Sequence, residues 1–81
     1  MNENEKIEYK KWLKDFGRCL SAHRNKLGLS QRQAAKQVGF HYKFYADIEY
    51  GRRPITTRTL FQVCKRFDLP VPYQSTVKFI T

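Results

Sequence analysis

The apolar residues of the central segment, QRQAAKQVGFHYKFYADIEY at residues 31–50, follow two short helical patterns separated by Gly39. On each side of Gly39 the apolar residues stand at positions i, i+1 and i+4, which places them on one narrow side of a helix. These residues are Ala34, Ala35 and Val38 before the glycine, and Phe44, Tyr45 and Ile48 after it. Two short helices that share an apolar side across a glycine corner form a helix-turn-helix.

The ends of these two helices carry recognisable signals. Ser30 and Gln33 have the spacing of a capping box, in which each side chain accepts a hydrogen bond from the other residue's backbone amide. Gly39 stands where a chain leaving a helix turns left-handed, and Gly51 closes the second helix. The apolar side of the second helix leaves a polar outer face at His41, Tyr42, Lys43, Ala46, Asp47 and Tyr50.

A second apolar stripe precedes this centre. It consists of Tyr9, Trp12, Leu13, Phe16 and Leu20, and predicts one long helix or two abutting helices from about Glu5 to Lys26. Asn2 and Glu5 can cap its start. Trp12 either adds to the core or forms a dimer contact. His23 lies at the edge of the same stripe, where we expect a hydrogen-bonded side chain and not a ligand or catalyst.

The C-terminal part contains one more helical pattern and a tail of different character. Leu60, Val63, Cys64 and Phe67 predict a helix over about 57–67, with Thr56 or Thr57 as its cap. The tail, 71–81, ends in residues of high strand propensity. Because one strand cannot satisfy its own backbone, the tail either pairs with a second chain, packs on its own core or stays disordered. The fold class is therefore all-α, with four to five helices, a central helix-turn-helix and a short tail able to form a strand.

The charge is strongly basic. The 81 residues carry 16 Lys and Arg against 7 Asp and Glu, a net charge of +9, and from residue 11 onward the count is 14 against 4. Such a field attracts polyanions. An acidic N-terminus without an apolar run is not a signal peptide, and no segment reaches membrane-spanning length. We therefore expect a single domain without membrane contact, in the cytoplasm of a bacterium or of a phage-infected cell, where it is nucleoid-associated or phage-encoded.

The two cysteines, Cys19 and Cys64, lack metal-ligand spacing and are too few for a disulfide scaffold. Both fall on apolar or half-apolar helical positions, so we expect small buried thiols, with a Cys19–Cys64 bridge disfavoured. His23, His41 and the carboxylates form no nucleophile–base or metal constellation, and no glycine-rich phosphate loop occurs. Neither an enzyme nor a cofactor, a metal site or a small-molecule ligand is indicated.

One group of residues resembles a known family. Arg24, then Gly28-Leu29-Ser30-Gln31, Ala35, Gly39, Ile48-Glu49-x-Gly51 and Thr59-Leu60 resemble the DNA-binding domain of the Cro and lambda-repressor type, the XRE-type regulators. The resemblance covers roughly Phe16 to Leu69, with 1–15 as a helical extension and 70–81 as the tail. It implies an all-α domain that binds operator DNA, usually as a homodimer. Ala34 in place of leucine, His23 in place of an aliphatic residue, and the aromatic second helix depart from the pattern.

The resemblance also implies roles for individual residues. Arg24 pairs with Glu49, a structural contact between the first and third helices. Tyr42, Lys43 and Asp47 become the principal readers of bases, with His41 and Ala46 near the groove. Asp47 either accepts from cytosine or pairs with Lys43 four residues earlier. Gln31 holds a phosphate at the helix N-terminus, and Arg32, Arg52 and Arg53 are further candidates for phosphate contacts.

These residues leave two functional hypotheses. The first is a sequence-specific regulator, a repressor in the simplest case, that binds a palindromic operator as a dimer. Its size suits a phage regulator, a restriction-modification controller or an antitoxin equally. The alternative is an antitoxin or adaptor whose tail binds a protein partner and whose DNA contact is secondary.

Overall fold

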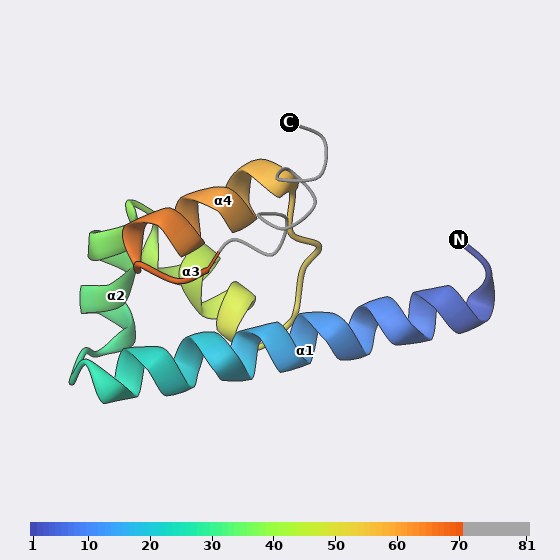
Figure 1. The fold of residues 1–81 in the computed structure, drawn as a ribbon, viewed down its shortest axis with the longest axis horizontal. Coiled ribbons are helices and arrows are strands. Elements are labelled where there is room, and N and C mark those ends of the chain that lie inside the picture. The colour runs from blue at the N-terminus through green and yellow to red at the C-terminus, as the bar shows by residue number, and fades with distance from the viewer. Residues whose placement is uncertain (71–81) are drawn as a thin grey trace.

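The computed structural model describes residues 1–70 and contains four helices in that range: α1 (Glu3–Lys26), α2 (Gln31–Val38), α3 (Tyr42–Glu49) and α4 (Thr57–Arg66) (Figure 1). The long helix α1 runs along one side, and the three short helices pack against its C-terminal half. The predicted all-α class is confirmed. The tail, for which a strand was considered, lies outside the described residues.

The predicted N-terminal helix is one continuous helix of 24 residues, and it begins two residues earlier than expected. Asn2 caps it: its Oδ1 accepts from the Glu5 amide at 2.8 Å, and the Glu5 carboxylate accepts from the Asn2 amide at 3.0 Å. This reciprocal pair satisfies two backbone donors that the first turn would otherwise leave open. The predicted capping box is confirmed.

The short helices are also fixed by local chemistry. Ser30 Oγ accepts from the Gln33 amide at 3.1 Å and the Gln33 side chain accepts from the Ser30 amide at 2.8 Å, so the second capping box is confirmed. Gly39 ends α2 at φ 82°, a left-handed conformation that favours glycine. Thr56 caps α4 through the Thr59 amide, and Gln62 of α4 donates to the Val38 carbonyl oxygen at the end of α2.

The core lies where the C-terminal half of α1 meets the three short helices. Its fully buried large side chains are Leu20, Val38, Tyr45, Ile48, Val63, Cys64 and Phe67. His23 lies at the edge of this core, and its Nε2 donates to the Phe67 carbonyl oxygen at 3.0 Å, as expected for a hydrogen-bonded histidine. The predicted apolar stripes therefore converge on one core.

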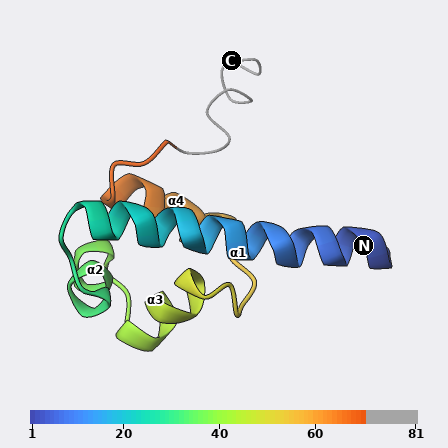
Figure 2. The same cartoon turned by 90° about the horizontal axis from the view of Figure 1, so that it is seen from below.

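The helix crossing between α1 and α3 depends on Gly17. A Cβ built at Gly17 would overlap the backbone carbonyl group of Glu49, and would lie 2.8 Å from the carbonyl oxygen of Ile48. The backbone of α1 therefore rests directly on the last turn of α3. Figure 2 shows α2 and α3 on the same side of α1. Only glycine permits this approach.

One expectation about α1 is corrected. Cys19 is exposed and not buried, because it lies on the side of the helix away from the three short helices; Cys64 is buried, and both thiols are free. Trp12 is 42% exposed and stacks on Phe16 with ring centroids 5.5 Å apart, so it covers the edge of the core without entering it. No helix among residues 1–70 is long and apolar enough to cross a bilayer.

Candidate nucleic-acid interface

The N-terminal edge of α3 is accessible to solvent. His41 and Lys43 are exposed and Tyr42 is half-buried. His41 is the N-cap of α3, and its Nδ1 accepts from the Lys43 amide at 3.2 Å. This cap fixes the backbone conformation at the start of α3. Three of the predicted DNA-contacting residues therefore lie together on one open edge.

Arg32 extends this edge onto α2. Its guanidinium lies over the Tyr42 ring, 4.4 Å from the ring centroid, while the arginine itself stays exposed. A cation above an aromatic face is attracted by the ring's quadrupole. The contact joins the first turn of α2 to the first turn of α3, and it holds a positive charge beside Tyr42 and Lys43.

Gln31 has a structural bond that the sequence did not reveal. Its side-chain Nε2 donates to Glu49 Oε1 at 3.0 Å, so the amide group points toward α3. The Ser30 cap uses only the Gln33 amide of α2. The backbone amides of the first turn remain at the helix end, where they can bind a phosphate. The geometry thus favours main-chain N–H groups over the Gln31 side chain for this contact.

The loop after α3 brings two more arginines to the same surface. Arg53 Nη2 donates to Asp47 Oδ2 at 3.3 Å, and Arg52 Nη1 lies 3.8 Å from Asp47 Oδ1. Each guanidinium also lies over an aromatic ring. The Arg53 Cζ is 4.6 Å from the centroid of the Phe44 ring, and the Arg52 Cζ is 4.4 Å from the centroid of the Tyr50 ring. Both arginines are thus held between a carboxylate and a ring.

This arrangement revises the interpretation of Asp47. We expected Asp47 either to accept from cytosine or to pair with Lys43, but its carboxylate pairs with Arg52 and Arg53, which follow it by five and six residues. The loop doubles back at Gly51, where φ is +66°, and carries the arginines to Asp47. Asp47 is therefore a partner of the loop arginines, which local helical spacing could not indicate.

The outward position predicted for Ala46 is wrong. Ala46 is buried, with 8% of its surface exposed. Helix α3 lies between α1 and α2 and buries Tyr45, Ala46, Ile48 and Glu49, an arc wider than the single stripe that the apolar spacing suggested. The methyl group of Ala46 is therefore not available to a thymine in this conformation.

Beneath the edge, Glu49 and Arg24 form the predicted ion pair. Arg24 Nε donates to Glu49 Oε2 at 2.6 Å and Nη2 donates to Oε1 at 3.1 Å, a bidentate contact in which the Glu49 side chain is 3% exposed. Arg24 Nη1 also donates to the Leu29 carbonyl oxygen. Together with Gln31, the pair links α1, α2 and α3, and so fixes the angle of the helix-turn-helix.

The electrostatics of this cluster keep Glu49 ionised. Burial alone would raise the pKa of Glu49, but the hydrogen bonds from Arg24 and from the Gln31 amide, together with the charge of Arg24, outweigh it, so the pKa is lowered. Burial, and after it the Glu49 carboxylate, raise the pKa of Tyr45 far above its usual value. The Tyr45 hydroxyl meets no partner at good hydrogen-bonding geometry within residues 1–70. The cluster stabilises the packing of α1, α2 and α3 against one another.

Sequence reasoning missed the part played by the aromatic residues in and directly after α3. Tyr42, Phe44 and Tyr50 each carry one arginine. The high number of aromatic residues in so short a helix departs from the family's pattern, and this departure could have indicated their role from the sequence. The resulting surface presents cations and hydrogen-bond donors around the exposed start of a helix, a set suited to phosphates and base edges.

The fold and this edge define a class: helix-turn-helix domains that place their second helix in the major groove. The chain matches the Helix-turn-helix family over residues 20–74 of its 81 residues. It belongs to the XRE-type helix-turn-helix family, as the resemblance to Cro and lambda repressor indicated, and is a double-stranded DNA-binding transcription regulator. No individual curated protein matches it significantly.

Proposed function

We propose that this protein is a sequence-specific repressor that binds a palindromic operator as a homodimer. The observation that carries the proposal is the open N-terminal edge of α3, where His41, Tyr42 and Lys43 project beside Arg32. In a helix-turn-helix this edge enters the major groove first. Repression requires only that the protein occupy the DNA and exclude other factors.

The base-reading residues follow from chemistry and position. Lys43 can donate to O6 and N7 of guanine, and the Tyr42 hydroxyl can donate or accept at a neighbouring base. Ala46 has no part in this proposal because it is buried. We assign Tyr42 and Lys43 as the principal readers and His41 as the cap that directs them.

The phosphate contacts flank these readers. On one side stand the amides at the start of α2 and Arg32; on the other stand Arg52 and Arg53. Because aromatic rings and Asp47 already hold the arginines, little side-chain entropy is lost when a phosphate binds. These contacts set affinity and register without reading sequence.

A dimer follows from the length of the reading helix. Helix α3 has 8 residues, of which Tyr42 and Lys43 at its start are accessible, so a single copy reads only a few base pairs. Two copies related by a two-fold axis, about 34 Å apart, read two half-sites on one face of the duplex. The half-exposed Trp12 and the tail are candidates for the dimer contact.

Selection of binding sites from random duplex DNA tests the proposal. We expect a palindrome with half-site centres about one helical turn, or 10 base pairs, apart. Lys43→Ala should relax the preference at one position per half-site, with a loss of about 1–3 kcal/mol at that base pair. Lys65→Ala, which removes an exposed charge from α4, outside the helix-turn-helix, is the matched control.

Two outcomes would contradict the proposal. Uniform weakening on all sequences by Tyr42→Ala and Lys43→Ala would make these residues phosphate contacts. Selection without any enriched motif, together with salt-insensitive binding, would remove the specific-regulator assignment.

A further inference from the structure

The N-terminal half of α1 carries three exposed lysines at equal spacing: Lys6, Lys10 and Lys14, here called the lysine row. They stand at i, i+4 and i+8, so they follow one side of the helix over about 12 Å. The N-terminal part of α1 extends beyond the three short helices (Figure 2), and the lysine row leads along it from the loop after α3. Neither the reading edge nor the core accounts for it.

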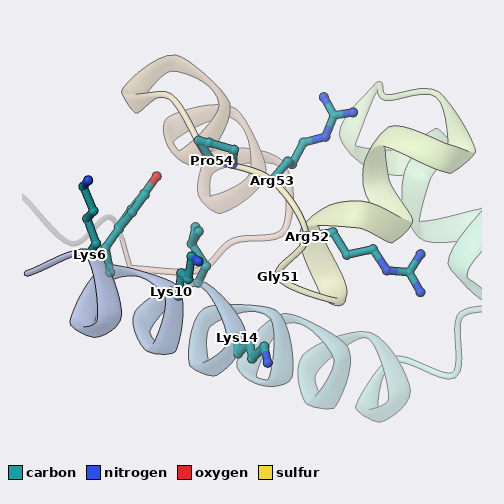
Figure 3. Close-up of a pocket in the computed structure, with 9 residues that line it drawn as sticks. Lys6, Lys10, Lys14, Gly51, Arg52, Arg53 and Pro54 are labelled. Carbon is teal, nitrogen blue, oxygen red and sulfur yellow. The ribbon is translucent and has the colours of Figure 1, made fainter. Parts of the chain in front are cut away.

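The lysine row faces the loop that follows α3. Lys6, Lys10 and Lys14 line a cavity of about 310 Å³ together with Gly51, Arg52, Arg53 and Pro54 (Figure 3). Tyr9 and Leu13 also line this cavity. Five cationic side chains from two separate segments thus border one groove.

The groove is held open by fixed contacts between α1 and the loop. The Tyr9 hydroxyl accepts from the Ile55 amide at 3.3 Å. A Cβ at Gly51 would lie 2.9 Å from the Cα and Cγ of Lys14, so the loop touches α1 directly at that point. The lysine row and the loop arginines therefore keep a constant relation to each other and to α3.

The arrangement of charge costs stability in the free protein. Like charges at i, i+4 repel each other, and a lysine in the first turns opposes the helix dipole. One neighbouring anion, Glu3, lies 3.4 Å from Lys6, but its side chain is 86% exposed and the pair is screened by solvent. A polyanion along the groove would offset the repulsion among the three lysines.

We propose that the lysine row binds the phosphate backbone of the DNA outside the base pairs read by α3, and so lengthens the footprint of each protomer. The inference rests on the proposed DNA-binding function. One strand presents a phosphate every 3.4 Å along the axis, so a row of about 12 Å matches three or four of them. Arg52 and Arg53 join this row to the phosphates beside the reading edge.

The test compares two variants of equal charge. The first replaces the row, Lys6→Gln, Lys10→Gln and Lys14→Gln. The second replaces three exposed lysines that do not border the groove, Lys11→Gln, Lys26→Gln and Lys65→Gln. Glutamine has a helix propensity close to that of lysine, so both variants should fold, which circular dichroism checks.

The measurement is the dependence of affinity on salt for a random-sequence duplex of 30 base pairs. With about 0.9 in the log–log slope for each phosphate contact, the row variant should lose about 2 to 3 in slope, and the control variant less than 1. Hydroxyl-radical protection by the row variant on a selected site should shorten at its outer ends, while the preferred bases stay the same.

The following results would overturn the inference about the lysine row. Equal slope losses in both variants would overturn the inference, because only the general field of the protein would be involved. A shortened footprint for neither variant would do the same, and both results leave the reading edge intact. Failure of the unaltered protein to bind any duplex would remove the proposed function and this inference together. Binding of inorganic phosphate in the groove without a difference in slope would assign the groove to small anions instead.

Discussion

Gly17 of α1 lies against the backbone carbonyl group of Glu49, the last residue of α3. This backbone-to-backbone contact sets the distance between the helix that anchors the fold and the helix that enters the groove. A glycine within a helix is less favourable than alanine by about 1 kcal/mol, so its presence here requires a packing reason. The close crossing supplies that reason.

Gly17→Ala should therefore destabilise the protein despite its better helix propensity. The added methyl group meets rigid backbone, and overpacking of this kind costs about 1–3 kcal/mol. Urea denaturation followed by circular dichroism measures the change. Cys19→Ala, two residues away at an exposed position, should stay within about 0.5 kcal/mol. A Gly17→Ala protein as stable as the parent would show that α3 can move away from α1.

The Arg24–Glu49 pair should show strong coupling in a double-mutant cycle. Arg24→Ala leaves a buried carboxylate without its cation, which costs about 3–5 kcal/mol. Glu49→Gln removes the charge but keeps a similar shape. The double variant should lose less than the sum of the two single losses, as expected for residues in direct contact. Additive losses would mean that the two residues act independently.

Acid should remove the contribution of Glu49. Its pKa is lowered on folding, so it stabilises the folded state fully above the ordinary carboxyl pKa of about 4.3, and the contribution falls as the pH drops toward the lowered value. Unfolding free energies measured from pH 7 to pH 3 should decline below about pH 4.5. The decline should be shallower in Glu49→Gln. Identical profiles for both proteins would contradict the lowered pKa.

The two thiols should differ in reactivity. Cys19 is exposed and should react with iodoacetamide at the rate of a free thiol, whereas Cys64 is buried and its pKa is raised by burial. Mass spectrometry should find one rapid modification under native conditions and a second only as the protein unfolds. The Cys19→Ala variant isolates the slow site. Two rapid modifications would mean that α4 leaves the core readily.

Asp47 should lower the affinity of the protein for DNA. Its carboxylate pairs with Arg52 and Arg53, and Asp47→Ala would free both guanidinium groups and remove a negative charge near the phosphates. We expect tighter binding to all duplexes and a salt slope larger by about 1. Glu8→Ala, an exposed acid on α1, has the same change in charge and should have a smaller effect. A changed preference at one base pair, without a gain in general affinity, would instead make Asp47 a reader of cytosine.

The features that could be predicted from sequence are those set by neighbours in the chain. The capping boxes at Asn2 and Ser30 and the left-handed turn at Gly39 depend on a few consecutive residues. The Arg24–Glu49 pair spans 25 residues, and the family resemblance supplied it.

The features that escaped prediction depend on how the helices cross. Ala46 is buried because α3 lies between two helices, and Cys19 is exposed because nothing covers that side of α1 within residues 1–70. Asp47 meets the loop arginines only after the chain reverses at Gly51. Periodicity gives the direction of a side chain from one helix axis, but it does not give the number of neighbours around that axis.

The unequal support along α1 has a dynamic consequence. From Leu13 onward the helix is covered by the core, whereas of its first eight residues only Tyr9 is sheltered at all. Backbone amides before Tyr9 should exchange with deuterium through fraying of the helix end, and those after Leu13 only through opening of the whole molecule. If nucleic acid rests on the frayed end, its arrival should slow that exchange, and the ordering of two helical turns would become part of the entropy of association.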